Sequence, residues 1–174
     1  MNRYALLPPC LCLAALSLLA AGAHPAGADN PVSATRWEFA PTDADGIAVA
    51  AINAPSGDNR IQIYCHGPSK DIVVMLIPRH LSGDAKDQSF TLAYDGGAAA
   101  PQAWRAQMYQ GRFYDFSLGA EEPGFAAVVD DLQHHAAVEA VITTAGREAQ
   151  RDAFTLNGAA AAIDQVFAAC GKGR

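Results

Sequence analysis

Four histidines are the residues of this sequence best suited to acid–base catalysis or metal binding. They are His66, His80, His134 and His135. Asp130 and Asp131 lie one helical turn before the last two, and Asp131 and His135 are spaced to share one helix face, as a pair of metal ligands would. Histidines at the C-terminal end of a helix are also explained by the partial negative charge there. We prefer this second interpretation and predict neither a bound metal nor a cofactor.

Motifs of the common hydrolase and nucleotide-binding classes are absent. The sequence holds no Gly-x-Ser-x-Gly, no His-Glu-x-x-His, no phosphate-binding loop and no Gly-x-Gly-x-x-Gly after a strand. Cys65 and His66 are adjacent, but neighbours on a strand point to opposite faces, so they are poorly placed to exchange a proton. Glu121 and Glu122 form an acidic pair, but acids before a helix are explained by its dipole. We therefore assign no catalytic residue.

A dense group of aromatic residues lies between positions 109 and 116, where the chain reads YQGRFYDF. Aromatic side chains supply large contact areas, and together with arginine they are enriched at protein interfaces. We predict a partner-binding surface formed by Tyr109, Arg112, Phe113, Tyr114 and Phe116. Core packing is the alternative use of the aromatic side chains, including both tryptophans.

Strand patterns with turn-forming residues between them fill the first two-thirds of the chain. Residues 60–65 alternate, so that Cys65 points toward the core with the isoleucines of that strand. The continuous apolar run 71–77 is typical of a central strand covered on both faces. Further strands are predicted at residues 35–40, 46–52 and 88–94.

Two turns in this region predict hairpins. Residues 41–45 (PTDAD) connect the first two strands. Asp95-Gly96 follows an alternating strand, which is a strong hairpin signal, and residues 104–108 offer an apolar face for the return strand.

The last third of the chain changes to helical spacing. Apolar residues after Pro123 predict a short helix that ends near His134 and His135. A strand at 138–144, a polar turn at 146–152 and a short strand at 153–156 follow. Asn157 is the predicted N-cap of a final helix, and Gly171 its stop. The whole predicts a mainly β (α+β) fold, an antiparallel β-sandwich-like domain with two short helices, the last at the C-terminus.

The composition indicates one folded domain without affinity for nucleic acid. The chain has 174 residues, of which 51% are hydrophobic and 17% charged, so it is neither disordered nor long enough for several domains. Its net charge is -6, and it lacks the clustered lysine and arginine that phosphate binding requires. No stretch reaches the length of a membrane-spanning helix, so we predict a protein that is not membrane-embedded.

Residues 1–28 have the three-part pattern of a secretory signal peptide. One positive charge precedes an apolar run from Cys10 to Ala20, and small residues follow. Two Ala-Gly-Ala triplets predict cleavage after Ala23 or after Ala28. Residues 29–174 then form a single β-rich domain, in the periplasm or secreted.

Removal of this segment leaves Cys65 and Cys170. Two cysteines in an oxidising compartment form a disulfide, whereas redox-active or metal-binding thiols are usually closely spaced. The predicted bond joins the end of the final helix to the strand of Cys65. It closes a loop of roughly 100 residues, which in the chain-entropy model stabilises the domain by about 4–5 kcal/mol.

The C-terminal region resembles a group of small bacterial envelope proteins. The matching features are the strand Phe154-Thr155-Leu156 before Asn157-Gly158, the alanine-rich helix to Ala169-Cys170, Cys65, Tyr94-Asp95-Gly96-Gly97 and Trp104. Periplasmic accessory proteins associated with type VI secretion resemble this plan. The resemblance implies a disulfide-bonded β-rich fold and no catalytic residues.

Two functional hypotheses follow from these patterns. The first is a non-catalytic secreted or periplasmic envelope protein that acts as a binding or accessory module for another envelope protein. The second is a small periplasmic hydrolase or metal-dependent enzyme that uses the histidines. Substitution of single histidines separates the two hypotheses, because only the second requires them.

Overall fold

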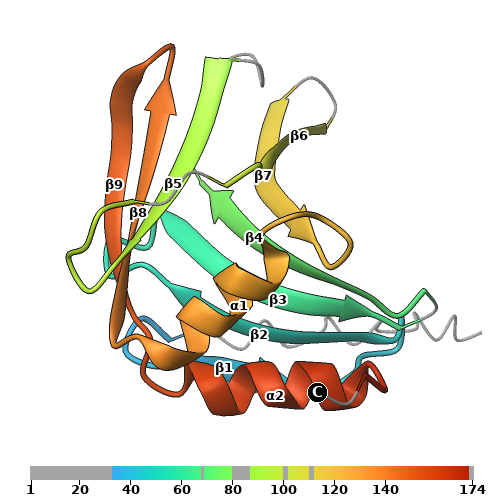
Figure 1. The fold of residues 1–174 in the computed structure, drawn as a ribbon. Helices are drawn as coiled ribbons and strands as arrows, with labels where there is room; N and C mark the ends of the chain where they lie inside the picture. Colours follow the sequence, from blue (N-terminus) through green and yellow to red (C-terminus); the bar gives the residue numbers. More distant parts are fainter. Residues whose placement is uncertain (1–32, 68, 80–86, 100–101, 110–111, 173–174) are drawn as a thin grey trace, which may run out of the picture. The chain divides into compact units, whose positions relative to one another are not determined.

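Alternating apolar residues in the first two-thirds of the chain build a six-stranded antiparallel sheet (Figure 1). The structure is a computed structural model, and it describes residues 33–67, 69–79, 87–99, 102–109 and 112–172. The strands of this sheet are β1 (Glu38–Ala40), β2 (Ile47–Asn53), β3 (Asn59–His66), β4 (Asp71–Pro78), β6 (Arg105–Tyr109) and β7 (Arg112–Gly119). They are ordered β1-β2-β3-β4-β7-β6, so that β3 and β4 are interior.

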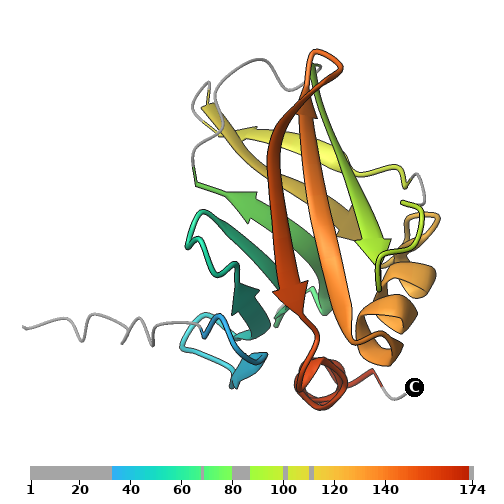
Figure 2. The same cartoon turned by 90° about the vertical axis from the view of Figure 1, so that its left-hand side faces the viewer.

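Three further strands form a second antiparallel sheet in the order β5-β8-β9. They are β5 (Gln88–Tyr94), β8 (Ala137–Thr144) and β9 (Arg147–Thr155). Figure 2 shows this sheet in front of the larger one. Phe90 of β5 stacks on Phe116 of β7 with 5.3 Å between ring centroids, so the inner faces of the sheets share one core.

Two helices complete this core. α1 (Phe125–His134) connects β7 to β8 and therefore crosses from one sheet to the other. α2 (Ala159–Ala169) packs against β1, β2, β3 and α1 (Figure 1). Each helix buries one apolar face, as its spacing predicts. The predicted mainly antiparallel β fold with two helices, the last near the C-terminus, is confirmed.

The disulfide between Cys65 and Cys170 is present, as predicted. Cys65 lies on the inner face of β3 and Cys170 at the C-terminal end of α2, with 5.7 Å between their Cα atoms. Both side chains are buried in the core. The bond therefore fastens the last helix to an interior strand 105 residues away in the chain.

The start of α2 differs from the prediction. Gly158, and not Asn157, occupies the N-cap position, with a φ of 78° that favours glycine. The Asn157 carbonyl instead accepts a hydrogen bond from the Trp37 N–H at 2.9 Å. This contact fastens the entry of the helix to the segment before β1.

The observed strand pairing confirms some of the predicted hairpins and turns and contradicts others. The hairpin through residues 41–45 is confirmed, because β1 pairs with β2. The turn at Asp95-Gly96 is also present, with φ values of 48° and 74°. Its predicted return strand is wrong: β5 pairs with β8, and β6 pairs with β7 in the other sheet. The predicted polar turn at 146–152 is wrong beyond Gly146, because β9 extends over Arg147–Thr155.

Residues Pro31–Arg174 cluster as one compact unit. The predicted signal peptide, residues 1–28, lies outside the described residues, so its cleavage stays a prediction. Within the described part of the chain, neither helix is long and apolar enough to cross a membrane.

Candidate functional site

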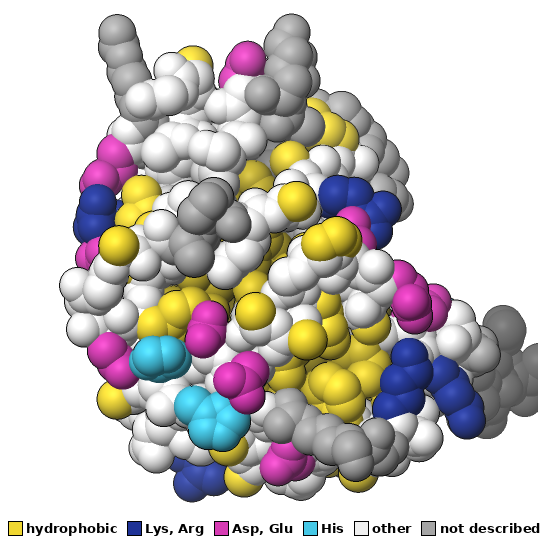
Figure 3. Space-filling model, in the orientation of Figure 1, with side chains coloured by type: hydrophobic (Ala, Val, Ile, Leu, Met, Phe, Trp, Pro, Cys, Tyr) yellow, Lys and Arg dark blue, Asp and Glu magenta, His cyan; other side chains and the backbone are white. Residues whose placement is uncertain are grey.

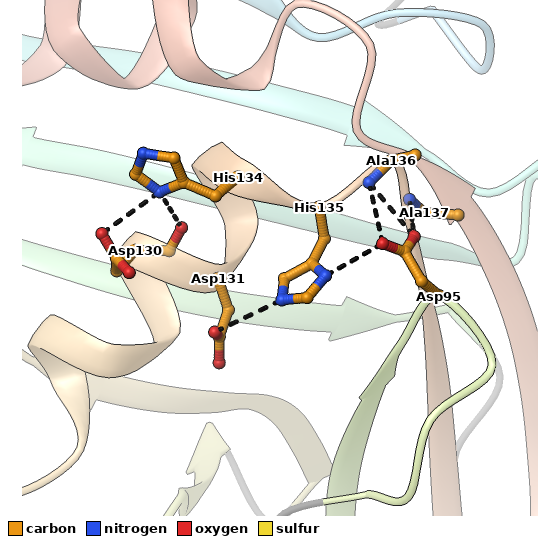
Figure 4. A network of polar contacts seen from close by, with 7 residues as sticks. All are labelled: Asp95, Asp130, Asp131, His134, His135, Ala136 and Ala137. Atoms are coloured by element: carbon orange, nitrogen blue, oxygen red, sulfur yellow. Dashed lines mark hydrogen bonds and ion pairs between the residues drawn. The ribbon is translucent and has the colours of Figure 1, made fainter.

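His135 lies between two carboxylates where α1 ends and β8 begins (Figure 4). Its Nδ1 is 2.9 Å from Oδ2 of Asp95, and its Nε2 is 3.6 Å from Oδ1 of Asp131. The Tyr94 ring stacks on the imidazole with 5.1 Å between centroids. Because Asp95 follows β5, this cluster joins the end of α1 to the three-stranded sheet.

Asp95 makes most of the hydrogen bonds in this cluster. Besides the contact with His135, its Oδ1 accepts hydrogen bonds from the N–H groups of Ala136 at 3.1 Å and Ala137 at 2.9 Å. The His135 hydrogen bond first, and then these N–H groups, lower the pKa of Asp95, because each stabilises the charged carboxylate. Burial raises the pKa of Tyr94, and the charge of Asp131 adds to this effect.

The cluster is built for holding elements together. A general base needs one imidazole nitrogen directed at a substrate or nucleophile. Both nitrogens of His135 face carboxylates instead, one in the α1 helix and one after β5. The considered metal pair, Asp131 and His135, gains no third ligand: no group of three histidines, cysteines or acids that could hold a metal exists in the described parts of the chain.

The other histidines do not join this cluster. His134 interacts with its own helix, since its Nδ1 is 2.8 Å from the Asp130 carbonyl and 3.1 Å from Oδ1 of the same residue. His66 ends β3, on the opposite side of Figure 1 from the end of α1, and its Nδ1 is 3.3 Å from Oγ of Ser69. His80 lies outside the described residues.

Two further candidates for covalent or acid catalysis, Cys65 and Glu122, are also engaged. Cys65 is in the disulfide and has no thiolate to offer. Glu122 forms an ion pair with Arg105, 2.7 Å between Oε1 and Nε, and accepts a hydrogen bond from the Gly119 N–H. Its role is to hold the turn after β7 against β6.

Two small cavities lie next to the helices and sheet ends. On the face drawn in Figure 3, apolar side chains gather in a hollow between α1 and α2. This cavity of 230 Å³ is lined by Phe125, Ala126, Val129, Asp130 and Phe167. The second, of 220 Å³, has Asp71, Arg105 and Glu122 in its wall. Ligand pockets are usually about 300–1,000 Å³, so neither cavity indicates a small-molecule substrate.

The structure describes two side chains of the predicted partner-binding surface. Tyr114 is 51% exposed, whereas Phe116 is 1% exposed and stacks on Phe90 in the core. Phe116 lies on the inner face of β7 with Leu118, so it belongs to the core and the prediction is wrong for this residue. The side chains outside the described part of the structure are those of Tyr109, Arg112 and Phe113.

The six-stranded sheet has a second face that points away from the core, which we name the outer face. Ile61, Ile63 and Cys65 of β3 are buried in the core, so the residues between them lie on the outer face. By the strand register this face includes Gln62, Tyr64, Val73, Met75, Gln107, Asp115 and Ser117. Both helices and the second sheet send their buried side chains to the inner side.

Interior strand β4 contributes an apolar stripe to the outer face. The prediction that this strand is central is confirmed, but only one of its faces meets the core. Val73, Met75 and Ile77 point to the other side, where Val73 and Ile77 are partly exposed. The outer face is therefore more apolar than a solvated sheet face, which normally alternates to polar residues.

Asp115 is a buried carboxylate on this outer face. The residue is 1% exposed, and its Oδ1 has no hydrogen-bond partner. Gln107 lies directly opposite on β6, but its amide donates to Oγ of Ser117 at 2.6 Å. Burial raises the pKa of Asp115 to about 6, because removal from water disfavours the charged form.

β7 has a bulge at the tyrosine that directly precedes this carboxylate. Gln107 pairs with Asp115 and Met108 pairs with Phe113, so Tyr114 is the extra residue of β7. The pKa of Tyr64 on β3 is raised by burial first, and then by the nearby Asp115, Asp71 and Tyr114. Asp115 and Tyr114 are neighbours in the chain and both raise the pKa of Tyr64, and we name these three residues the acid–aromatic site.

Sequence reasoning missed Asp115 and Tyr64. The available signal was the carboxylate inside the aromatic run Phe113-Tyr114-Asp115-Phe116, but alternation alone does not give the face of a residue beside a bulge. No protein-family model, no curated protein and no solved structure matches the chain. The chemistry of the acid–aromatic site therefore has to be interpreted from its own residues.

Proposed function

We propose that this chain is a non-catalytic binding module, periplasmic or secreted, that binds another envelope protein through the outer face of its six-stranded sheet. The observation that carries this proposal is Asp115, a buried carboxylate whose Oδ1 has no hydrogen-bond partner. Such a group lowers the stability of a folded domain unless another molecule supplies its partner. The partly exposed apolar stripe of β4 and the exposed Tyr114 beside it offer contact area for that molecule.

The arrangement of the histidines favours binding over catalysis. His135 has a carboxylate at each ring nitrogen, and His134 contacts Asp130 of its own helix. His66 contacts the hydroxyl of Ser69 in the turn after β3, where the same hydroxyl lies 3.5 Å from the His66 carbonyl oxygen, so this contact closes a local turn. Among the contacts described for these three histidines, the hydrolase hypothesis is left with this one alone.

The compartment is inferred from two features. The first 28 residues have the pattern of a signal peptide. The Cys65–Cys170 disulfide is of a kind that persists in oxidising compartments and is rare in the cytosol. The resemblance to periplasmic accessory proteins points to the same compartment.

Site-specific photo-crosslinking tests this proposal in the native host. A photoreactive amino acid replaces Val73 on the outer face or the exposed Tyr114 next to Asp115 in the full chain, and Ala161 on the exposed side of α2 in a matched control. We expect the Val73 and Tyr114 positions to crosslink to the same envelope protein, and the purified pair to bind each other. No crosslinked partner from the outer face, or equal labelling from Ala161, overturns the proposal.

A further inference from the structure

Asp115 is the strongest unexplained group in the described structure. It is 1% exposed, and its Oδ1 accepts no hydrogen bond. Two amides of the outer face are committed elsewhere: the Gln107 amide donates to Ser117, and the Gln62 amide contacts Sδ of Met75 at 3.5 Å. The positive charge of Arg105 is paired with Glu122. Among the described residues, Oδ1 of Asp115 is therefore a buried acceptor without a donor.

The residues around Asp115 indicate which charge a group that binds there should carry. Asp71 and Asp115 both raise the pKa of Tyr64, and Oδ1 of Asp115 is an acceptor without a partner, so this site calls for a hydrogen-bond donor and not for an anion. Burial is the cause of the raised pKa of Asp115, and no described positive charge contributes to the shift. Tyrosine rings bind cations through their faces, and two tyrosines belong to this site. A carboxylate next to aromatic rings is a combination that recognises guanidinium or ammonium groups.

We propose that the acid–aromatic site binds a cationic side chain, arginine or lysine, of the protein that docks on the outer face, with Asp115 as its counter-charge and Tyr64 and Tyr114 as flanking rings. This inference rests on the proposed function. A long basic side chain extends toward the buried carboxylate while the rest of the partner covers the apolar stripe of β4. Arginine suits such a position, because its planar guanidinium stacks on rings and pairs with carboxylates.

Small cationic probes test the assignment without knowledge of the partner. Nα-acetyl-arginine amide and Nα-acetyl-lysine amide are titrated into the full protein at pH 7.5, with Nα-acetyl-citrulline amide as the neutral control. The readouts are NMR signals of Asp115, Tyr64 and Tyr114. We expect saturable shifts with both cations and at least tenfold weaker binding of citrulline. Equal binding of the neutral probe overturns the inference.

Variants assign the effect to individual groups. Asp115→Asn keeps the shape and removes the charge, and we expect it to weaken binding of the arginine probe at least tenfold. Asp45→Asn removes an equally large charge from an exposed turn and should leave binding unchanged. Tyr64→Phe should retain binding, because the ring remains, whereas Tyr64→Leu should weaken it. Unchanged binding by folded Asp115→Asn protein contradicts the proposed counter-charge.

The pH dependence gives an independent readout. The Asp115 carboxyl is protonated below about pH 6, so affinity for the arginine probe should fall about tenfold between pH 7.5 and pH 5. Affinity that is constant over this range contradicts a role for the carboxylate. The charged groups on the strands around it, Arg60, Asp71 and Arg105, are present equally in the Asp115→Asn variant, which isolates the contribution of Asp115.

The outcome also separates this inference from the proposed function. A specific crosslinked partner combined with Asp115-independent probe binding refutes the cation site and retains the binding module. Probe binding that depends on Asp115 without any crosslinked partner retains the cation site and refutes the protein partner. Putrescine, a free diamine, is titrated as well. If putrescine binds more tightly than the capped arginine, the site is assigned to a small amine and not to a protein side chain.

Discussion

Replacing Asp115 by asparagine should change the pH dependence of stability in a defined direction. The folded protein holds this carboxyl with a pKa of about 6, whereas the unfolded chain holds it near the ordinary value of 3.8. The folded state therefore binds the proton more tightly than the unfolded state between these values. Stability must fall as the pH rises from about 4 to 6 and stay level above that, because the group is then ionised in both states.

The size of this effect follows from the difference between the two pKa values. A carboxyl pKa that rises from 3.8 to about 6 corresponds to about 3 kcal/mol, since each pKa unit represents about 1.4 kcal/mol. Integration of the titration places about 2 kcal/mol of this loss between pH 4.5 and pH 7.5. The asparagine variant carries no titrating group at this position. The cost of its own buried amide, about 1–3 kcal/mol, is the same at every pH.

Urea unfolding measured at several pH values tests this reasoning, with tryptophan fluorescence as the probe because Trp37 is buried. The free energy of unfolding of Asp115→Asn minus that of the wild type should increase by about 2 kcal/mol from pH 4.5 to pH 7.5. Asp45→Asn serves as the control for a change in net charge. A difference that stays constant with pH refutes the buried, unpaired state of the carboxylate.

Three other perturbations test the remaining features. Cys170→Ala should lower the free energy of unfolding by about 2–5 kcal/mol in urea. After alkylation without reductant, the intact mass of the wild type should show no alkyl group on Cys65 or Cys170. Gly67→Ala should lower the melting temperature strongly, because its Cβ would lie 2.2 Å from the Gly46 carbonyl oxygen. Asp95→Asn and His135→Ala should lower the melting temperature less than additively when combined, and leave partner crosslinking intact. Asp95 stabilises the fold only while ionised, so its contribution is lost as the pH falls below about 4.

Local patterns predicted the helices and strands well, because the hydrophobic spacing of each one lies within its own few residues. The helix ending at His134 and the inward direction of Cys65 both follow from spacing along a few residues. The pairing of strands, by contrast, depends on residues far apart in the sequence. Asp95-Gly96 forms the expected turn, yet the chain after it crosses to the other sheet, because the local signal fixes a turn and not the strand that follows.

The candidate site was less predictable than the fold because it depends on long-range register. The aromatic segment before Phe116 was recognised as unusual, but a one-residue bulge at Tyr114 decides which of its side chains face outward. Tyr64 belongs to β3, about fifty residues away, and joins the site only through β4. Neither the burial of Asp115 nor its missing hydrogen bond has a signature in the sequence.

The disulfide and the buried carboxylate have opposite effects on the same small domain. Ionised Asp115 lowers stability by about 3 kcal/mol, out of the roughly 5–15 kcal/mol that a typical domain has in total. A covalent bond between residues 105 positions apart contributes about 4–5 kcal/mol in the chain-entropy model, which exceeds that loss. Because the bond acts from the inner face of β3, it adds this stability without occupying the outer face. The domain can therefore retain a charged group that destabilises the free protein, and a cationic partner would recover part of that free energy on binding.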